Sequence, residues 1–238
     1  MNMIAILRKE MRAYFVSPIA YVVIAAFLVI CGVFFALLAL AQPGSVDASM
    51  GIVFSNATVV LLIIAPALTM RLLAEEQKSG TIELLLTAPV RDWEVVIGKY
   101  LASLVVFLIG LALTLFYPLI LNRYGTPDLG PIAGGYVGLV LFGAAFLAVG
   151  ILASALTQNQ VVSALVAFAI LLGLWLIGAF ANSARPPVSD VLSYLSIITH
   201  YNDFQRGLID TKDIVYYIAV IAIALFLAVR TLETRRWT

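Results

Sequence analysis

Six long apolar segments alternate with short polar stretches along the chain, and the middle of each apolar segment contains no charged residue. A helix needs about 20 mainly apolar residues to cross the hydrocarbon core of a bilayer. Lipid-exposed backbone has no water to satisfy its amides, and the alternation of a membrane β-barrel is missing. We therefore predict an all-α integral membrane protein, with one transmembrane domain over residues 1–238 and spans at 19–41, 52–73, 95–121, 132–156, 161–181 and 214–232.

Composition supports the same class of protein. With 63% hydrophobic and 11% charged residues, the chain could not present a normal wetted surface as a soluble globule, so we expect it in the lipid bilayer. The net charge of +1 gives no sign of a nucleic-acid partner. The first apolar run is longer than the roughly 7 to 15 residues of a signal-peptide core, so we expect it to be retained as a span.

Lys and Arg are distributed unequally between the two sides that these spans define. Ten lie on one side, including those near both chain ends, and four on the other, namely Arg123, Arg185, Arg206 and Lys212. Because cytoplasmic loops hold the excess of basic residues, both termini are expected in the cytoplasm.

Residues 1–18 carry apolar and charged side chains at roughly helical spacing. We predict an amphipathic helix in the cytoplasmic interface, with its basic side chains toward lipid head groups and its apolar stripe among acyl chains. The alternative is a basic N-terminus that only directs topology. The charged residues are Arg8, Lys9, Glu10 and Arg12, and the apolar ones are Ile4, Leu7, Met11, Tyr14 and Phe15.

A charged island at residues 71–99 separates the second and third spans. It holds nine of the chain's 27 charged residues, which are 14 basic and 13 acidic. We predict that Glu75 and Glu76 carry the second span into water and that Ser79 and Gly80 form a turn. Residues 74–94 then form a cytoplasmic docking region, the largest polar surface available on that side.

Within this region the sequence predicts a short helix at residues 82–87. Thr81 can cap it, and Glu83 stands in its first turn, where the helix dipole favours a carboxylate. Pro89 stops this helix, and Asp92 is expected to cap the next one. Three consecutive leucines cannot share one face of so short a helix, so some bury against a partner protein or, alternatively, against lipid as an interfacial hairpin. They are Leu84, Leu85 and Leu86.

The chain lacks two kinds of energy-coupling machinery. It contains no Gly-x-x-x-x-Gly-Lys-Ser/Thr loop to cradle ATP. No ionisable residue stands near the middle of a predicted span, where a secondary transporter places its proton or ion sites. We therefore expect no catalytic, cofactor or metal site in this chain, and energy that arrives through a partner at the charged island.

Span four contains Gly130, Gly134 and Gly138 at four-residue spacing, followed by Gly143 and Gly150. Small residues at this spacing let helix backbones approach closely. We expect a tight helix contact, and a contact within the subunit is favoured over one across a dimer.

Residues 182–213, before the last span, are expected outside the cytoplasm as half-buried helices. Ser189 or Asp190 can cap a short helix there, and Gly207 can end a second polar turn. We expect His200 to anchor this loop beside Arg206 and Asp210 rather than to bind metal or act in catalysis, because a metal site needs more ligands. The loop residues singled out are His200, Asp203, Arg206, Gly207 and Asp210.

Three segments carry a family resemblance: MRLLAEEQKSGTIELLLTAPVRDWEVVIGKY, RKEMRAYFVSPIAYVV and THYNDFQRGLIDTKDIVYY. The first contains a Glu-x-x-x-Gly-Thr-Ile-Glu pattern, formed by Glu76, Gly80, Thr81, Ile82 and Glu83. The chain resembles the permease subunits of ABC-2 type transporters over most of its length. The similarity is greatest to the permease of the gliding-motility-associated ABC system and its relatives.

The resemblance implies a six-span half-transporter of the bacterial inner membrane that pairs with a second copy or a related permease. A separate cytoplasmic ATPase, which binds ATP and Mg²⁺, would dock on a coupling helix at residues 81–87. The N-terminal helix would be the connecting helix of the family, and residues 182–213 would shape an exit in the outer leaflet. The implied ATPase-contacting residues are Glu76, Gly80, Thr81, Ile82, Glu83, Leu84, Leu85 and Leu86.

Two other classes of function stay open. In one, the chain is a mechanotransmitting or assembly subunit, whose ATP-driven motion acts on an extracytoplasmic partner such as a membrane subunit with a large outer domain. In the other, it is an ATP-independent channel or a membrane enzyme, which the lack of ionisable groups in mid-span disfavours.

Overall fold

The computed structural model describes residues 2–39, 46–81, 90–124, 127–183 and 185–235, and all regular structure in these segments is helical. The all-α prediction is confirmed. A π-helical turn, Phe35–Ala39, continues α2. The α-helices are α1 (Asn2–Val16), α2 (Pro18–Phe34), α3 (Val46–Thr69), α4 (Ala74–Lys78), α6 (Asp92–Leu113), α7 (Phe116–Tyr124), α8 (Leu129–Leu156), α9 (Gln160–Ser183), α10 (Val188–Leu195), α11 (Ile197–Gln205) and α12 (Thr211–Arg235).

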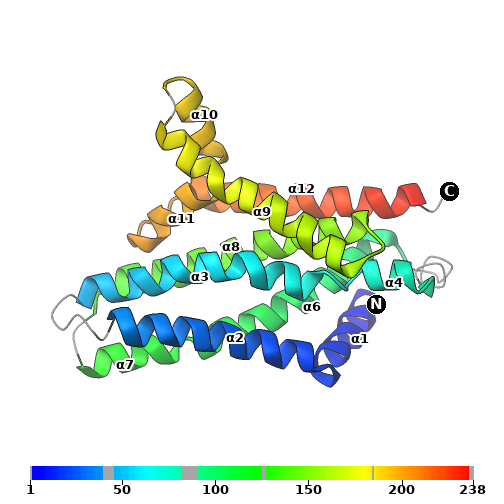
Figure 1. Ribbon diagram of the computed structural model, residues 1–238, viewed down its shortest axis with the longest axis horizontal. Helices are drawn as coiled ribbons and strands as arrows, with labels where there is room; N and C mark the ends of the chain where they lie inside the picture. The colour runs from blue at the N-terminus through cyan, green and yellow to red at the C-terminus, as the bar shows by residue number, and fades with distance from the viewer. Residues whose placement is uncertain (1, 40–45, 82–89, 125–126, 184, 236–238) are drawn as a thin grey trace.

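Six helical stretches among the described residues are long and apolar enough to cross a membrane, as predicted. They are Pro18–Leu37, Met50–Lys78, Asp92–Arg123, Leu129–Leu156, Gln160–Ala181 and Thr211–Thr234. Figure 1 shows α1, α4 and both chain ends at one end of the bundle, and α7 and α11 at the other. We call these the α1 end and the α7 end.

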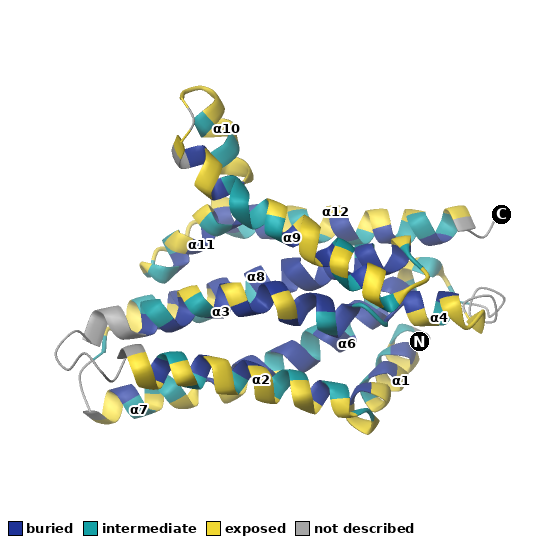
Figure 2. Ribbon diagram, in the orientation of Figure 1, coloured by how far each residue is buried: buried dark blue, intermediate teal, exposed yellow. Residues whose placement is uncertain are grey.

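Helix α8 forms the centre of the bundle. It packs against α3, α6, α9, α11 and α12, and its residues are buried along most of its length (Figure 2). The outer helices keep large apolar side chains exposed, for example Val29 of α2, Phe180 of α9 and Phe226 of α12. Such faces are suited to contact with lipid acyl chains.

Glycines on α8 allow this central packing. A Cβ atom at Gly138 would lie 2.7 Å from Cβ of Phe204, and one at Gly134 would lie 2.5 Å from the Phe204 carbonyl oxygen. Further along the helix, Gly143 and Gly150 make similarly close contacts with side chains of α6 and α3. The tight helix contact therefore lies within the subunit, as expected.

The third span is not the single helix predicted at residues 95–121. It breaks between α6 and α7 because Pro118 has no N–H and its ring clashes with the carbonyl group four residues earlier, that of Thr114. The Thr114 oxygen instead accepts hydrogen bonds from Tyr117 N and from the Tyr136 hydroxyl, both at 2.9 Å. The hydrogen bond from Tyr136 therefore joins the break in the third span to α8.

Two predicted helix caps are wrong. Helix α6 starts at Asp92 itself, because the Glu94 carboxylate accepts a hydrogen bond from Arg91 N at 3.0 Å and makes Arg91 the capping residue. Helix α10 starts ahead of both Ser189 and Asp190 and has no side-chain cap. The predicted pair of helices before the last span is present as α10 and α11.

Candidate functional site

A buried network of charged residues joins three helices at the α1 end. The side chain of Lys99 on α6 is 1% exposed, and its Nζ lies 2.8 Å from Glu10 Oε1 on α1 and 3.0 Å from Glu76 Oε2 on α4. Lys9 Nζ lies 2.9 Å from Glu76 Oε1 and 3.8 Å from Glu10 Oε1. We call Lys9, Glu10, Glu76 and Lys99 the ion-pair network.

The network balances two ammonium groups against two carboxylates. An unpaired ion in a protein interior costs several kcal/mol, so Lys99 is tolerated here because both glutamates approach it. Partial burial lowers the pKa of Lys9, but its hydrogen bond to Glu76 and the charges of Glu76 and Glu10 outweigh that effect and raise the pKa above its ordinary value. Lys9 therefore stays protonated and holds the open edge of the network.

Two sequence interpretations are wrong at this network. Glu75 is exposed as predicted, but Glu76 turns inward, and Glu10, which we placed on the polar face of the N-terminal helix, is buried against α6. The reason is the close approach of α1 to α6: a Cβ atom at Gly98 would lie 3.0 Å from Cγ2 of Ile6. Helix α1 therefore packs on the bundle along one face.

A second set of contacts ties the end of α3 to the junction between α1 and α2. Arg71 donates from Nη1 to the Ser17 hydroxyl at 3.1 Å, and its guanidinium carbon lies 4.8 Å from the centre of the Tyr14 ring. The Tyr14 hydroxyl donates to the Leu68 carbonyl oxygen at 2.6 Å. Burial raises the pKa of Tyr14, so this hydroxyl keeps the proton that it donates.

The turn between α3 and α4 is fastened to the end of α8. The Ser154 hydroxyl accepts hydrogen bonds from Leu73 N and Ala74 N, both at 3.0 Å, and donates to the Met70 carbonyl oxygen at 3.1 Å. Gln77 donates from Nε2 to the Ala155 carbonyl oxygen at 3.0 Å. One hydroxyl thus satisfies three of the backbone groups that a helix break leaves open.

The structure reaches only part of the predicted coupling helix. Glu76 belongs to the ion-pair network, and Gly80 has a φ of +70°, which suits the predicted turn. The Thr81 hydroxyl lies 2.8 Å from that of Ser79 and donates back to the Glu76 carbonyl oxygen at 3.4 Å. The other predicted contacts lie outside the described residues: Ile82, Glu83, Leu84, Leu85 and Leu86.

At the α7 end, His200 anchors α11 to its two neighbours. Its Nδ1 lies 2.6 Å from Asp213 Oδ1 on α12, and its Nε2 lies 3.0 Å from the Tyr194 carbonyl oxygen on α10. The imidazole ring stacks on Tyr216, with 4.0 Å between ring centres. We expected Arg206 beside this histidine and missed Asp213, which is fully buried.

The other residues singled out in this loop shape the turn into α12. Asp210 accepts a hydrogen bond from Lys212 N at 3.1 Å, and this bond together with the lysine side chain holds the pKa of Asp210 below its ordinary value. Lys212 also lies 3.6 Å from Asp203, while Arg206 is exposed. Gly207 has a φ of +78° and lies close to the start of α8. Within the described segments, His, Cys, Asp and Glu form no group of three that could hold a metal.

Comparison with known proteins identifies the family. The family described as ABC-2 family transporter protein matches residues 38–230. The probable multidrug ABC transporter permease YbhR, from Escherichia coli K12 and from Escherichia coli O157:H7, is 24% identical over 135 residues, which are 56% of this chain and 36% of the relative. The chain thus spans about a third of the length of these curated relatives. With six apolar spans and a family match over most of its length, this multi-pass membrane protein belongs to the ABC-2 family of transporter permeases.

Proposed function

We propose that this chain is the permease subunit of an ATP-driven transporter and that it receives the work of ATP hydrolysis at its α1 end. One observation carries the proposal: Glu76 of α4 and Lys99 of α6, which flank residues 82–89 in the chain, pair at 3.0 Å. Both sides of the predicted coupling helix are thereby joined to each other. A force on that helix reaches α4 and α6 together.

The contacts around the network determine where such a force goes. Helix α4 is held to the end of α8 by Ser154 and Gln77, and α6 is held to α1 by the pair of Lys99 and Glu10. Packed interiors have little free volume, so displacement of α4 moves these neighbours instead of being absorbed by a loop. We infer that ATPase closure shifts α1, α6 and α8 as a connected group.

The partners follow from this arrangement and from the charge distribution. The excess of Lys and Arg supports a cytoplasmic position for the α1 end and both termini. The family resemblance supports a bacterial inner membrane. The ATP and Mg²⁺ belong to a separate ATPase subunit, since the sequence contains no phosphate-binding loop. A second copy or a related permease completes the transporter, and the three resembling segments favour the gliding-motility-associated branch.

The test is purification of the tagged protein from its native host in mild detergent, with identification of the co-purifying ATPase and measurement of its turnover after reconstitution. We expect Leu85→Arg to lose the ATPase. Lys99→Met should keep the ATPase bound but change its turnover, and the control Lys212→Met, on an exposed lysine at the α7 end, should behave as wild type. Absence of any ATPase from the wild-type preparation would refute the proposal, as would wild-type turnover in Lys99→Met.

One observation favours a mechanotransmitting subunit as the second candidate. Helix α10 has no buried residue, and it projects from the bundle at the tip of α9 (Figure 1). Val188, Val191 and Tyr194 are spaced three apart on this short helix and are more than half exposed. A photo-crosslinking residue in place of Tyr194 would join to a membrane subunit with a large extracytoplasmic domain if this reading holds, and to lipid alone if it does not.

A further inference from the structure

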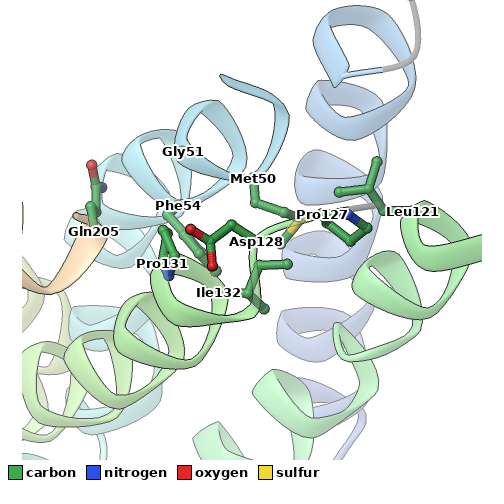
Figure 3. Close-up of a pocket in the computed structure, with 9 residues that line it drawn as sticks. All are labelled: Met50, Gly51, Phe54, Leu121, Pro127, Asp128, Pro131, Ile132 and Gln205. Atoms are coloured by element: carbon green, nitrogen blue, oxygen red, sulfur yellow. The ribbon is translucent and has the colours of Figure 1, made fainter. Parts of the chain in front are cut away.

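A cavity of about 280 Å³ opens at the α7 end, between α3, α7, α8 and α11. Figure 3 shows its walls, with Asp128 at the centre of the view between side chains from α3 and α8. Four large apolar side chains of the lining are buried: Met50, Phe54, Leu121 and Ile132. None of the contacts at the ion-pair network reaches this far, so the cavity is a separate site.

The polar part of the lining has one sign of charge. Asp128, which is exposed, accepts through Oδ1 a hydrogen bond from Gly130 N at 2.9 Å, which caps α8, and no hydrogen bond from a described residue reaches its second oxygen. Among the described residues, no Lys or Arg forms an ion pair with Asp128. The other polar side chain, Gln205, exchanges hydrogen bonds with Ser55 and is uncharged. The lining therefore offers one carboxylate beside an apolar surface.

We propose that this cavity binds a small organic cation with an apolar body. The apolar body would lie among Met50, Phe54, Leu121 and Ile132, and the cationic group would face the Asp128 carboxylate. The claim that such a cation is a substrate of the permease rests on the proposed function. The claim that the cavity binds such a cation rests on the cavity alone.

The volume limits the size of the ligand. A cavity of about 150 Å³ accommodates benzene. A volume of about 280 Å³ therefore suits one aromatic ring with a quaternary ammonium group, at the lower end of ligand-pocket sizes. Benzyltrimethylammonium has this size and charge. Neopentylbenzene has the same shape with carbon in place of nitrogen, so it reports shape without charge.

Two variants isolate the carboxylate and the space. Asp128→Asn removes the charge and keeps the helix cap, because Asn caps helices about as well as Asp. A Cβ atom at Gly51, which lines the cavity, would meet no atom of the described residues within 4 Å, so the side chain of Gly51→Leu starts in open space and occupies part of the cavity. Gly173 of α9 is equally open and lies away from the cavity, so Gly173→Leu is the matched control.

The experiment is equilibrium binding of tritiated benzyltrimethylammonium to the purified full-length protein in neutral detergent, by scintillation proximity. We expect saturable binding to wild type and to Gly173→Leu, at least tenfold weaker binding to Asp128→Asn, and none to Gly51→Leu. Neopentylbenzene should compete at least tenfold less well than the unlabelled cation. In the reconstituted complex with its ATPase, the cation should change turnover in wild type and have no effect in Gly51→Leu.

Three outcomes would overturn the site: no saturable binding, binding that survives Gly51→Leu, or equal competition by the uncharged compound. Binding without an effect on turnover would overturn the substrate class and leave the site. The binding measurement requires no ATPase. A negative binding result therefore overturns the site without bearing on the proposed function. The proposed function fails separately, if no ATPase co-purifies with the wild-type protein.

Discussion

Replacing Lys99 with methionine removes the centre of the ion-pair network. The apolar stem of the side chain is kept, but Glu10 and Glu76, whose side chains are 10% and 15% exposed, are left with Lys9 alone. Leaving a buried charge without its partner costs about 3–5 kcal/mol. In a chain of this size, 1 kcal/mol shifts the unfolding midpoint by roughly 2–4 °C, so we expect Lys99→Met to unfold roughly 6–20 °C below wild type.

The triple variant Lys99→Met, Glu10→Gln and Glu76→Gln tests the reason for this loss. It carries three substitutions instead of one but leaves no unpaired buried charge. Replacing a whole buried ion-pair group with uncharged residues often changes stability little. We therefore expect the triple variant to recover most of the decrease in unfolding temperature that Lys99→Met causes. A cost that instead grew with each substitution would mean that packing, and not charge pairing, dominates at this junction.

Cys31 supplies the assay. It is the chain's single cysteine and is 2% exposed in α2, so a thiol-reactive fluorogenic dye labels it only when the bundle opens. The control is Glu233→Gln, which breaks an ion pair between Glu233 and Arg230. Their side chains are 38% and 62% exposed, respectively. A surface pair is worth about 0.5 kcal/mol, so this shift should stay under roughly 2 °C. If Lys99→Met moved the midpoint no further than this control, the reasoning on the network would be refuted.

The same labelling assay checks three further variants. Gly138→Ala places a methyl group against α11 and should cost about 1–3 kcal/mol, whereas Gly173→Ala, in open space, should not lower the midpoint. Asp213→Ala leaves buried His200 without its carboxylate partner and should cost about 1.5–3 kcal/mol; equal stability would exclude an anchoring role. Ser154→Ala leaves two backbone N–H groups without an acceptor, and each unsatisfied group should cost about 1–3 kcal/mol. An unchanged midpoint would show that the turn after α3 does not depend on this hydroxyl.

The spans were predictable because one physical quantity, apolar length against bilayer thickness, decides them. The break in the third span was also readable, since Pro118 cannot continue a regular helix, but the length of the apolar run concealed it. Helix ends were less predictable. At α6, for example, the choice of cap depends on a glutamate inside the helix that reaches back to Arg91 N.

The ion-pair network was not predictable from the island alone, because its members come from helices far apart in the chain. The sequence pattern indicated that α1 is amphipathic but did not identify its buried face or the helix that covers it. Ile6, Glu10 and Tyr14 are spaced four apart and are all buried, whereas Ile4 and Phe15, which we placed on the apolar stripe, are exposed. A glutamate in the middle of such a stripe, and Gly98 beside Lys99, are the signals that could have indicated the pairing.

Helix α8 connects the two ends of the molecule. At the α1 end Ser154 holds the turn before α4, and at the α7 end Ile132 lines the cavity. Between them, Gly138 and Gly143 bring α11 and α6 into close contact with the helix, so little free space remains for it to bend locally. A displacement that enters through α4 is therefore expected to reach the cavity as a movement of the whole helix, which is how a site at the α7 end would respond to an ATPase bound at the α1 end.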